Sequence, residues 1–219
     1  MCRMLGIKNF DYQKHKKVIE EFFKLAQSGK TLPGNSPGHL DGWGIGYYQN
    51  GQAIVFKSGN SVVEEKDKFF KKIREIAKSK ILILHFRKSA WKNTSNTKNA
   101  HPFKYKNYLF AHNGTIYDYK HLLKMNALDS ETFFRFILGS PGNSPTEKIK
   151  KAVENIKNKH KFSSLTFLFS EGINLYAYRD YQKSPDYYTL YQDNSLISSQ
   201  PLPFKNRWKI LKSKKLVIL

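Results

Sequence analysis

The sequence predicts an α+β sandwich in which antiparallel sheets are layered with a few helices. Strand and helix patterns interleave without the regular alternation of a doubly wound parallel sheet. The Asn50-Gly51 pair lies between two short strand patterns and is typical of an antiparallel hairpin turn. After residue 160, aromatic and β-branched residues dominate, which favours strands. With 219 residues, 40% of them hydrophobic, the chain can bury a core, and we expect one domain over residues 1–219.

The first part of the chain is expected to supply a strand, a helix and a hairpin. Residues 2–7 form a short apolar run that predicts a buried strand. Residues 13–27 place apolar side chains at helical spacing among lysines and glutamates, and Ser28-Gly29 ends this amphipathic helix. A loop rich in proline and glycine then leads to the hairpin strands, expected over 44–48 and 53–57.

The middle of the chain repeats these patterns. Residues 64–79 are amphipathic at helical spacing, and residues 80–87 form an apolar strand that ends in the charge of Arg87. Another strand, over 108–112, ends at Asn113-Gly114. The remaining expected elements are helices over 118–125, 130–138 and 146–159 and strands over 164–169, 174–179, 187–191, 195–199 and 208–219.

The charge balance favours a solvated, lysine-rich surface. The chain has 38 basic and 17 acidic residues, a net charge of +21, which attracts phosphate groups by its field alone. Only six of the basic residues are arginines, whereas nucleic-acid sites usually use the guanidinium fork. The lysines are also spread along the whole length instead of forming one basic arm. A nucleic-acid-binding face is therefore the less favoured alternative.

The single cysteine excludes an internal disulfide framework and favours a reducing compartment, so we expect a cytoplasmic protein. No apolar run approaches the ~18 to 20 residues that span a bilayer, and we expect no membrane anchor. The seven histidines lack ligand spacing supported by carboxylates or thiols, so neither a metal nor an organic cofactor is expected.

Cys2 is the most informative position. It follows the initiator methionine directly, and cysteine is small enough for an aminopeptidase to remove Met1. The thiol and the freed α-amine would then belong to one residue, and an amine with a pKa of ~7.7 to 8.0 can act as general base for the thiol. The alternative is an ordinary buried cysteine that packs as a small hydrophobe.

Polar groups at the ends of two apolar strands suit the same chemistry. Asn113 offers a side-chain amide N–H and Gly114 an unobstructed backbone N–H, and two such donors can bind the oxyanion of an acyl intermediate. The alternative is a tight Asn-Gly turn. Arg87 suits a bidentate grip on a ligand carboxylate, or a surface ion pair.

Two further motifs are weaker when taken alone. The motif Asn-Ala-His-Pro at 99–102 can position His101 for a function, or it can simply form a turn between two segments. Asp129 precedes a predicted helix and suits an N-cap or near-cap residue.

The joint order of these motifs resembles the class II glutamine amidotransferases, especially their short stand-alone members. The order is Cys2, Gly-Trp-Gly in the strand at 42–46, His-Phe-Arg, Asn-Ala-His-Pro, His-Asn-Gly and Asp-Ser-Glu, and it spans residues 2 to about 135. These proteins are N-terminal-nucleophile hydrolases, so the resemblance implies a four-layer αββα sandwich.

The resemblance also implies a role for each motif. Synthetase-linked members have a tryptophan directly after the substrate arginine, where this chain has Lys88. The implied roles are nucleophile for Cys2, oxyanion hole for Asn113 and Gly114, binding of the glutamine α-carboxylate for Arg87, acceptance of the α-ammonium for Asp129, and support of the substrate pocket for His101.

The implied activity is hydrolysis or transfer of an amide from glutamine or a γ-glutamyl amide, through a γ-glutamyl thioester that releases ammonia and glutamate. Three alternatives stay open. The chain could be a glutaminase subunit whose ammonia serves a separate synthetase. It could hydrolyse a larger γ-glutamyl conjugate. It could also be a non-catalytic basic module that binds nucleic acid.

Overall fold

The computed structural model describes residues 2–203 and 207–219, and it contains two antiparallel sheets. The larger sheet has seven strands: β1 (Arg3–Asp11), β2 (Trp43–Gln49), β3 (Gln52–Ser58), β4 (Lys78–Phe86), β9 (Tyr191–Asp193), β10 (Leu196–Ser198) and β11 (Lys209–Ile210). Their order across the sheet is β11-β9-β10-β1-β4-β2-β3.

The smaller sheet has five strands: β5 (Phe103–Tyr105), β6 (Tyr108–Asn113), β7 (Thr166–Ser170), β8 (Leu175–Tyr178) and β12 (Leu216–Ile218). Their order is β12-β8-β7-β6-β5. Every pairing described in the two sheets is antiparallel, as the Asn50-Gly51 hairpin predicted.

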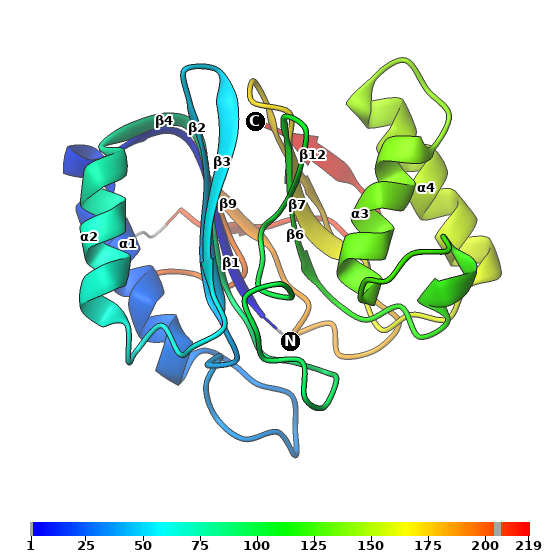
Figure 1. Cartoon of the computed structure of the whole chain (residues 1–219), viewed down its shortest axis with the longest axis horizontal. Helices are drawn as coiled ribbons and strands as arrows, with labels where there is room; N and C mark the ends of the chain where they lie inside the picture. The colour runs from blue at the N-terminus through cyan, green and yellow to red at the C-terminus, as the bar shows by residue number, and fades with distance from the viewer. Residues whose placement is uncertain (1, 204–206) are drawn as a thin grey trace.

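The helices complete four layers, which confirms the αββα architecture (Figure 1). The helices are α1 (Tyr12–Ser28), α2 (Lys66–Ile76), α3 (Asp129–Gly139) and α4 (Pro145–Lys159), with a short 3-10 turn η1 (Tyr119–His121). Helices α1 and α2 cover the outer face of the larger sheet, and α3 and α4 cover that of the smaller sheet. Within the described parts of the chain, each helix is too short or too polar to cross a membrane.

Three clusters of buried side chains hold the layers together. One lies between α1, α2 and the larger sheet, and includes Phe22, Trp43 and Phe86. A second lies between α3, α4 and the smaller sheet, where the rings of Phe110 and Phe134 stack with centroids 5.2 Å apart. The third lies between the two sheets. Burying these apolar side chains on both faces of each sheet stabilises the stack of layers.

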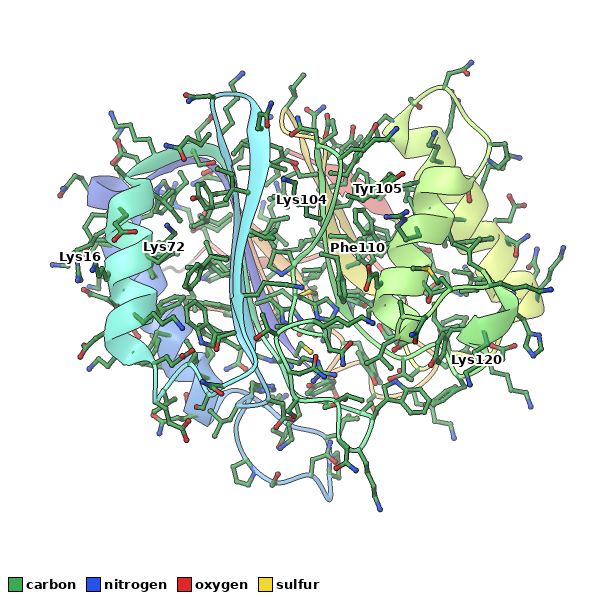
Figure 2. All side chains as sticks on the ribbon, in the orientation of Figure 1. Lys16, Lys72, Lys104, Tyr105, Phe110 and Lys120 are labelled. Carbon is green, nitrogen blue, oxygen red and sulfur yellow. The ribbon has the colours of Figure 1, made fainter. Side chains whose placement is uncertain are left out.

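Lysine side chains surround this core. Figure 2 shows Lys16 of α1 and Lys120 of η1 pointing to solvent from opposite sides of the molecule, and both are exposed. This distribution agrees with a solvated lysine-rich surface.

Three sequence predictions were wrong in detail. The helix expected over 118–125 is only the turn η1, and the strand expected over 187–191 begins at Tyr191. The strand expected over 208–219 is divided into β11 and β12, which belong to different sheets, because the chain crosses between the sheets at 211–215. Strand β5 was not predicted.

Candidate active site

Cys2 and Arg87 are brought together by the register of the larger sheet. Arg3 of β1 pairs with Phe86 of the antiparallel strand β4. The residue before Arg3 therefore lies beside the residue after Phe86, at the same edge of the sheet. The backbone of Arg87 continues the pairing, since its nitrogen donates to the carbonyl oxygen of Gly42 at 2.8 Å. Cys2 is buried, with 5% of its surface exposed.

Asn113, at the end of β6, reaches Cys2 from the smaller sheet. The backbone nitrogen of Cys2 donates to Oδ1 of Asn113 at 2.8 Å. Nδ2 of the same side chain is buried and has no hydrogen-bond partner among residues 2–203 and 207–219. A buried amide donor without a partner is costly, which makes this N–H a candidate donor to a ligand.

The ring of His112, the residue before Asn113, is hydrogen-bonded through both of its nitrogens. Its Nε2 lies 3.0 Å from the carbonyl oxygen of Ser164, which can only accept, so Nε2 carries the hydrogen. Its Nδ1 then accepts from Oγ of Ser130 at 2.9 Å. Burial lowers the pKa of His112 to about 4, which keeps the ring neutral at pH 7.

Gly114 occupies a position where a side chain does not fit. An added Cβ would clash with the carbonyl oxygen of Ser164 and lie 2.6 Å from Nε2 of His112. Gly114 lines the same small cavity as Cys2. The close approach therefore explains the glycine better than a turn alone does.

Arg87 is buried at the cavity, but its guanidinium is turned toward its own loop. Nη1 donates to the carbonyl oxygen of Thr94 at 2.9 Å, and Nη2 donates to the hydroxyls of Ser89 and Thr94, each at 3.0 Å. The backbone nitrogen of Ser89 donates to Asp41 at 2.7 Å, so Asp41 holds the start of this loop. Among residues 2–203 and 207–219, the guanidinium of Arg87 donates to hydroxyl and carbonyl oxygens and forms no surface ion pair, the alternative that the sequence left open.

Asp129 is the first residue of α3, and its carboxylate is not used as an N-cap. Leu128 occupies the N-cap position, while the Asp129 oxygens accept from the backbone nitrogen of Ile116 and from Nε1 of Trp91, both at 3.1 Å. Burial raises the pKa of Asp129 to about 6, although these hydrogen bonds act in the opposite direction. A buried carboxylate with a raised pKa at a cavity is typical of a functional site.

His101 lies behind the cavity in a stack of two histidines. The rings of His85 and His101 are 4.2 Å apart at an interplanar angle of 22°, and burial lowers the pKa of both rings well below the usual value. Both ring nitrogens of His101 are buried without a partner in the described residues. The carbonyl of His101 packs so closely on β2 that a Cβ at Gly44 would clash with it. This tight packing suits a support of the pocket.

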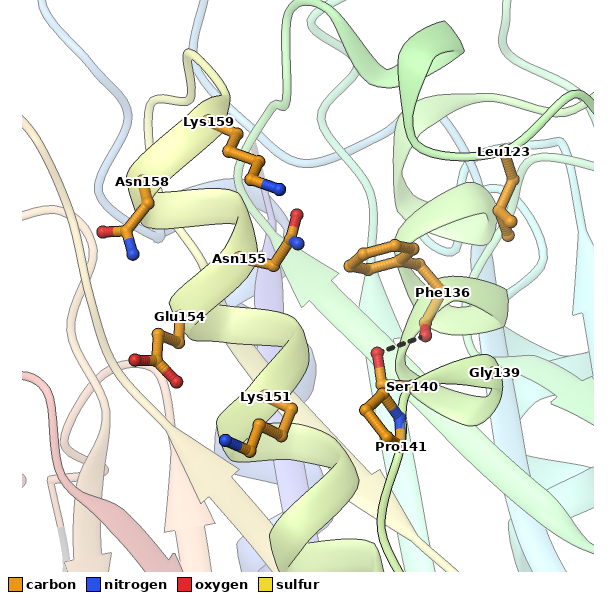
Figure 3. A pocket seen from close by; sticks show the side chains of 10 residues that line it. All are labelled: Leu123, Phe136, Gly139, Ser140, Pro141, Lys151, Glu154, Asn155, Asn158 and Lys159. Carbon is orange, nitrogen blue, oxygen red and sulfur yellow. Dashed lines mark hydrogen bonds between the residues drawn. The ribbon is translucent and has the colours of Figure 1, made fainter.

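The cavity at these residues is small. It measures about 30 Å³ and is lined by Cys2, Arg87, Lys88, Ser89, Ala90, Trp91, Asn99, His101, Phe103, His112, Gly114, Thr115, Leu128, Asp129 and Ser130. A larger cavity of about 480 Å³ lies elsewhere, between α3 and α4, and is lined by Phe136, Lys151 and Asn155 among others (Figure 3). The predicted site residues do not line that cavity. Among the described residues, no group of three His, Cys, Asp or Glu side chains could hold a metal ion.

Sequence reasoning missed Trp91. Directly after Arg87 the chain has lysine, yet the indole of Trp91, four positions further on, reaches Asp129 and lines the cavity. An isolated tryptophan in a polar loop was the available signal, because a large ring in such a loop usually has a packing or binding role.

The four-layer αββα fold, with Cys2 of one sheet bonded to Asn113 of the other, is of the N-terminal-nucleophile hydrolase type. The family of class-II glutamine amidotransferases matches residues 1–192. The chain belongs to this family.

One curated protein is similar in sequence to most of this chain. An uncharacterized protein of Methanocaldococcus jannaschii is 30% identical over 199 residues, which cover 83% of this chain and 52% of the relative. The chain thus spans about half the length of the curated relative that it matches.

Solved structures show the same fold. A glutamine aminotransferase class-II domain protein from Silicibacter pomeroyi is 16% identical with a TM-score of 0.64, covering 99% of this chain and 94% of its own. Glutamine phosphoribosylpyrophosphate amidotransferase from B. subtilis is 14% identical with a TM-score of 0.62, covering 91% of this chain and 42% of its own. At these identities the likeness concerns the fold alone.

Proposed function

We propose that this protein hydrolyses the side-chain amide of glutamine with Cys2 as its N-terminal nucleophile, after removal of Met1. The observation that carries the proposal is the 2.8 Å hydrogen bond from the Cys2 nitrogen to Asn113 Oδ1, combined with the unpartnered Nδ2 of the same amide. The family assignment supplies the reaction class.

Each atom of this arrangement has a task in the proposed reaction. The Cys2 α-amine takes the thiol proton, and the thiolate attacks the γ-carbonyl carbon. Asn113 Nδ2–H and the Gly114 N–H hold the negative charge that develops on the carbonyl oxygen. The C–N bond then breaks, and the amine returns the proton to the leaving ammonia. Water hydrolyses the γ-glutamyl thioester to glutamate and regenerates the thiol.

The paired charges of Arg87 and Asp129 support an amino-acid substrate. A zwitterionic α-carbon needs a cation for its carboxylate and an anion for its ammonium, and both residues line the cavity. A cavity of about 30 Å³ has room for roughly one or two water molecules. Glutamine binding therefore requires the loop at 88–94 to move and the guanidinium to exchange its loop partners for the carboxylate.

Steady-state assays test this proposal. The purified protein should release glutamate and ammonia from glutamine in equal amounts, and Cys2→Ala should abolish the release. Cys2→Ser is the matched control, since it keeps a nucleophile of similar size and should retain only a trace of activity. Equal rates for wild type and Cys2→Ala would refute the role of Cys2.

We further propose that the ammonia is used by a separate synthetase subunit. Support comes from the family, whose description names transfer of an amide from glutamine. Affinity purification from the native cell under moderate salt tests this idea. A partner that raises glutaminase turnover in the presence of its own acceptor is the expected result, and purification of an active, unaccompanied chain would contradict it.

A further inference from the structure

A second cavity lies against the proposed glutamine site. It measures about 270 Å³, and three of its lining residues, Ala90, Trp91 and Thr115, also line the cavity that contains Cys2. The two spaces therefore share one wall. The larger one is completed by Leu32, Tyr117, Ser163 and Tyr188.

The shared wall contains a single large side chain, Trp91. Its Nε1 donates to Asp129 at 3.1 Å, and its backbone nitrogen donates to Oγ of Ser89 at 3.1 Å. Both partners belong to the cavity that contains Cys2. A loop movement that admits glutamine thus also moves the partition between the two spaces.

The second cavity borders the cavity that contains Cys2, because three residues line both. Tyr188 is buried, and its pKa is raised to about 12, mainly by burial, with Tyr117 and the charge of a Cys2 thiolate adding to the rise. Two hydrogen bonds hold Ser163 and Thr115, which line the second cavity, in place. The nitrogen of Ser163 donates to the carbonyl oxygen of Thr115 at 2.8 Å, and the nitrogen of Thr115 donates to Ser163 Oγ at 3.0 Å. When the loop that carries Trp91 moves, a group attached to the amide nitrogen would enter this space while the carbonyl remains at Cys2.

The lining selects a chemical class of ligand. All seven lining residues are uncharged, and three of them carry aromatic rings: Trp91, Tyr117 and Tyr188. Aromatic faces bind planar, apolar groups and stack on other rings. With a net charge of +21 on the chain, a cationic group would also be disfavoured by the overall field.

We propose that the second cavity binds the amine side of γ-glutamyl amides, so that the enzyme cleaves the γ-glutamyl amides of neutral aromatic amines in addition to glutamine. This inference rests on the proposed function, since it uses the same nucleophile. The Cys2 thiolate displaces the arylamine, which leaves with the proton from the α-amine. Water then hydrolyses the γ-glutamyl thioester to glutamate.

The test compares three substrates: glutamine, γ-glutamyl methylamide and γ-glutamyl anilide. Tyr117 is 56% exposed, so its replacement should leave the fold intact. In Tyr117→Ala, kcat/KM for the anilide should fall at least tenfold relative to kcat/KM for the methylamide. Tyr117→Phe keeps the ring and should restore the ratio. Ile173→Ala, at a position that is 67% exposed and lines neither cavity, is the matched surface control.

The possible outcomes separate the two proposals. Turnover of glutamine without turnover of the anilide, or an anilide ratio unaffected by Tyr117→Ala, overturns the arylamine site while the glutaminase proposal stands. Failure of all three substrates overturns the glutaminase proposal, and the arylamine site with it.

Discussion

The backbone nitrogen of Cys2 lies 2.8 Å from Oδ1 of Asn113, a residue 111 positions away on the other sheet. The side-chain oxygen of Asn113 thereby holds the nitrogen of the proposed nucleophile, and its N–H, which has no partner in the described residues, is the proposed donor to the substrate. This geometry ties the position of the proposed base to that of the oxyanion hole, because both depend on one rigid group at the end of β6.

Asn113→Asp tests these two roles separately. The aspartate keeps an acceptor for the Cys2 nitrogen but replaces the N–H donor with an oxygen. We expect kcat for glutamine to fall by ~10² to 10³, the usual effect of losing one oxyanion donor, with KM changed much less. Asn113→Ala removes both interactions and should lose at least as much. A kcat for Asn113→Asp equal to that of the wild type would remove Asn113 from the oxyanion hole.

Arg87→Lys tests the carboxylate site. Lysine keeps the charge but loses the fork, and loss of one charge-assisted hydrogen bond costs roughly 1.5–3 kcal/mol. We therefore expect KM for glutamine to rise by about 10- to 150-fold with a smaller change in kcat. Thermal unfolding serves as the control, since the guanidinium also holds Ser89 and Thr94. An unchanged KM in a folded variant would place the α-carboxylate elsewhere.

The sequence was a good guide to the layers and a poorer guide to the loops. Strands β1 and β4 were predictable because their apolar runs are long and buried on both faces. The sequence also singled out Cys2, Arg87, Asn113 and Asp129, since each adjoins a strong strand or helix signal. Cys2, Arg87 and Asp129 line one cavity and Asn113 contacts Cys2, while their roles in the reaction stay predictions.

Long-range pairings explain what could not be predicted. Trp91 meets Asp129 across 38 residues, and no local pattern encodes that contact. Strand β5 has three residues, too few for an alternation signal. Strands β11 and β12 follow one another in a stretch of mixed apolar and lysine residues, although they join different sheets. Tertiary packing decides such segments more than local propensity does.

The raised pKa of Asp129 predicts a pH dependence of glutamine binding. Below about pH 6 the carboxyl becomes neutral and loses its attraction for the α-ammonium group. In Cys2→Ala, which binds without turnover, the affinity for glutamine should fall about tenfold for each pH unit below 6. Calorimetric titration between pH 5 and pH 8 measures this, and a constant affinity over that range would count against Asp129 as the ammonium acceptor.

Trp91→Phe should move this transition upward. The indole N–H donates to the charged carboxylate and lowers its pKa, so loss of the donor lets burial raise the pKa of Asp129 further above 6. The variant keeps an aromatic ring at the partition between the cavities. Titrating glutamine into Cys2→Ala with and without Trp91→Phe compares the two midpoints, and coincident midpoints would mean that the indole has no influence on Asp129.

Acid should destabilise the fold through its buried histidines. Burial lowers the pKa of His85, His101 and His112, so the unfolded chain takes up their protons first as the pH falls below the usual value of 6.5. Asp129 has the opposite effect on the free energy of unfolding between about pH 6 and pH 4, because its pKa is raised. The effect of one carboxyl group is smaller than the combined effect of three histidines. The free energy of unfolding should therefore decrease between pH 6.5 and pH 4.

Urea titrations across this range measure the acid effect. His112→Gln should reduce the slope of stability against pH, whereas His121→Gln, at an exposed position, should leave it unchanged. A free energy of unfolding that stays constant from pH 6.5 to pH 4 would contradict the expectation that the buried histidine rings are neutral in the folded protein.

The most direct test of the central claim is the intact mass of the purified protein before and after treatment with a diazoketone analogue of glutamine. We expect a chain that has lost one methionine and that gains a single adduct, mapped to Cys2 and suppressed by excess glutamine. A chain that retains Met1 and stays unlabelled would contradict the assignment of Cys2 as an N-terminal nucleophile.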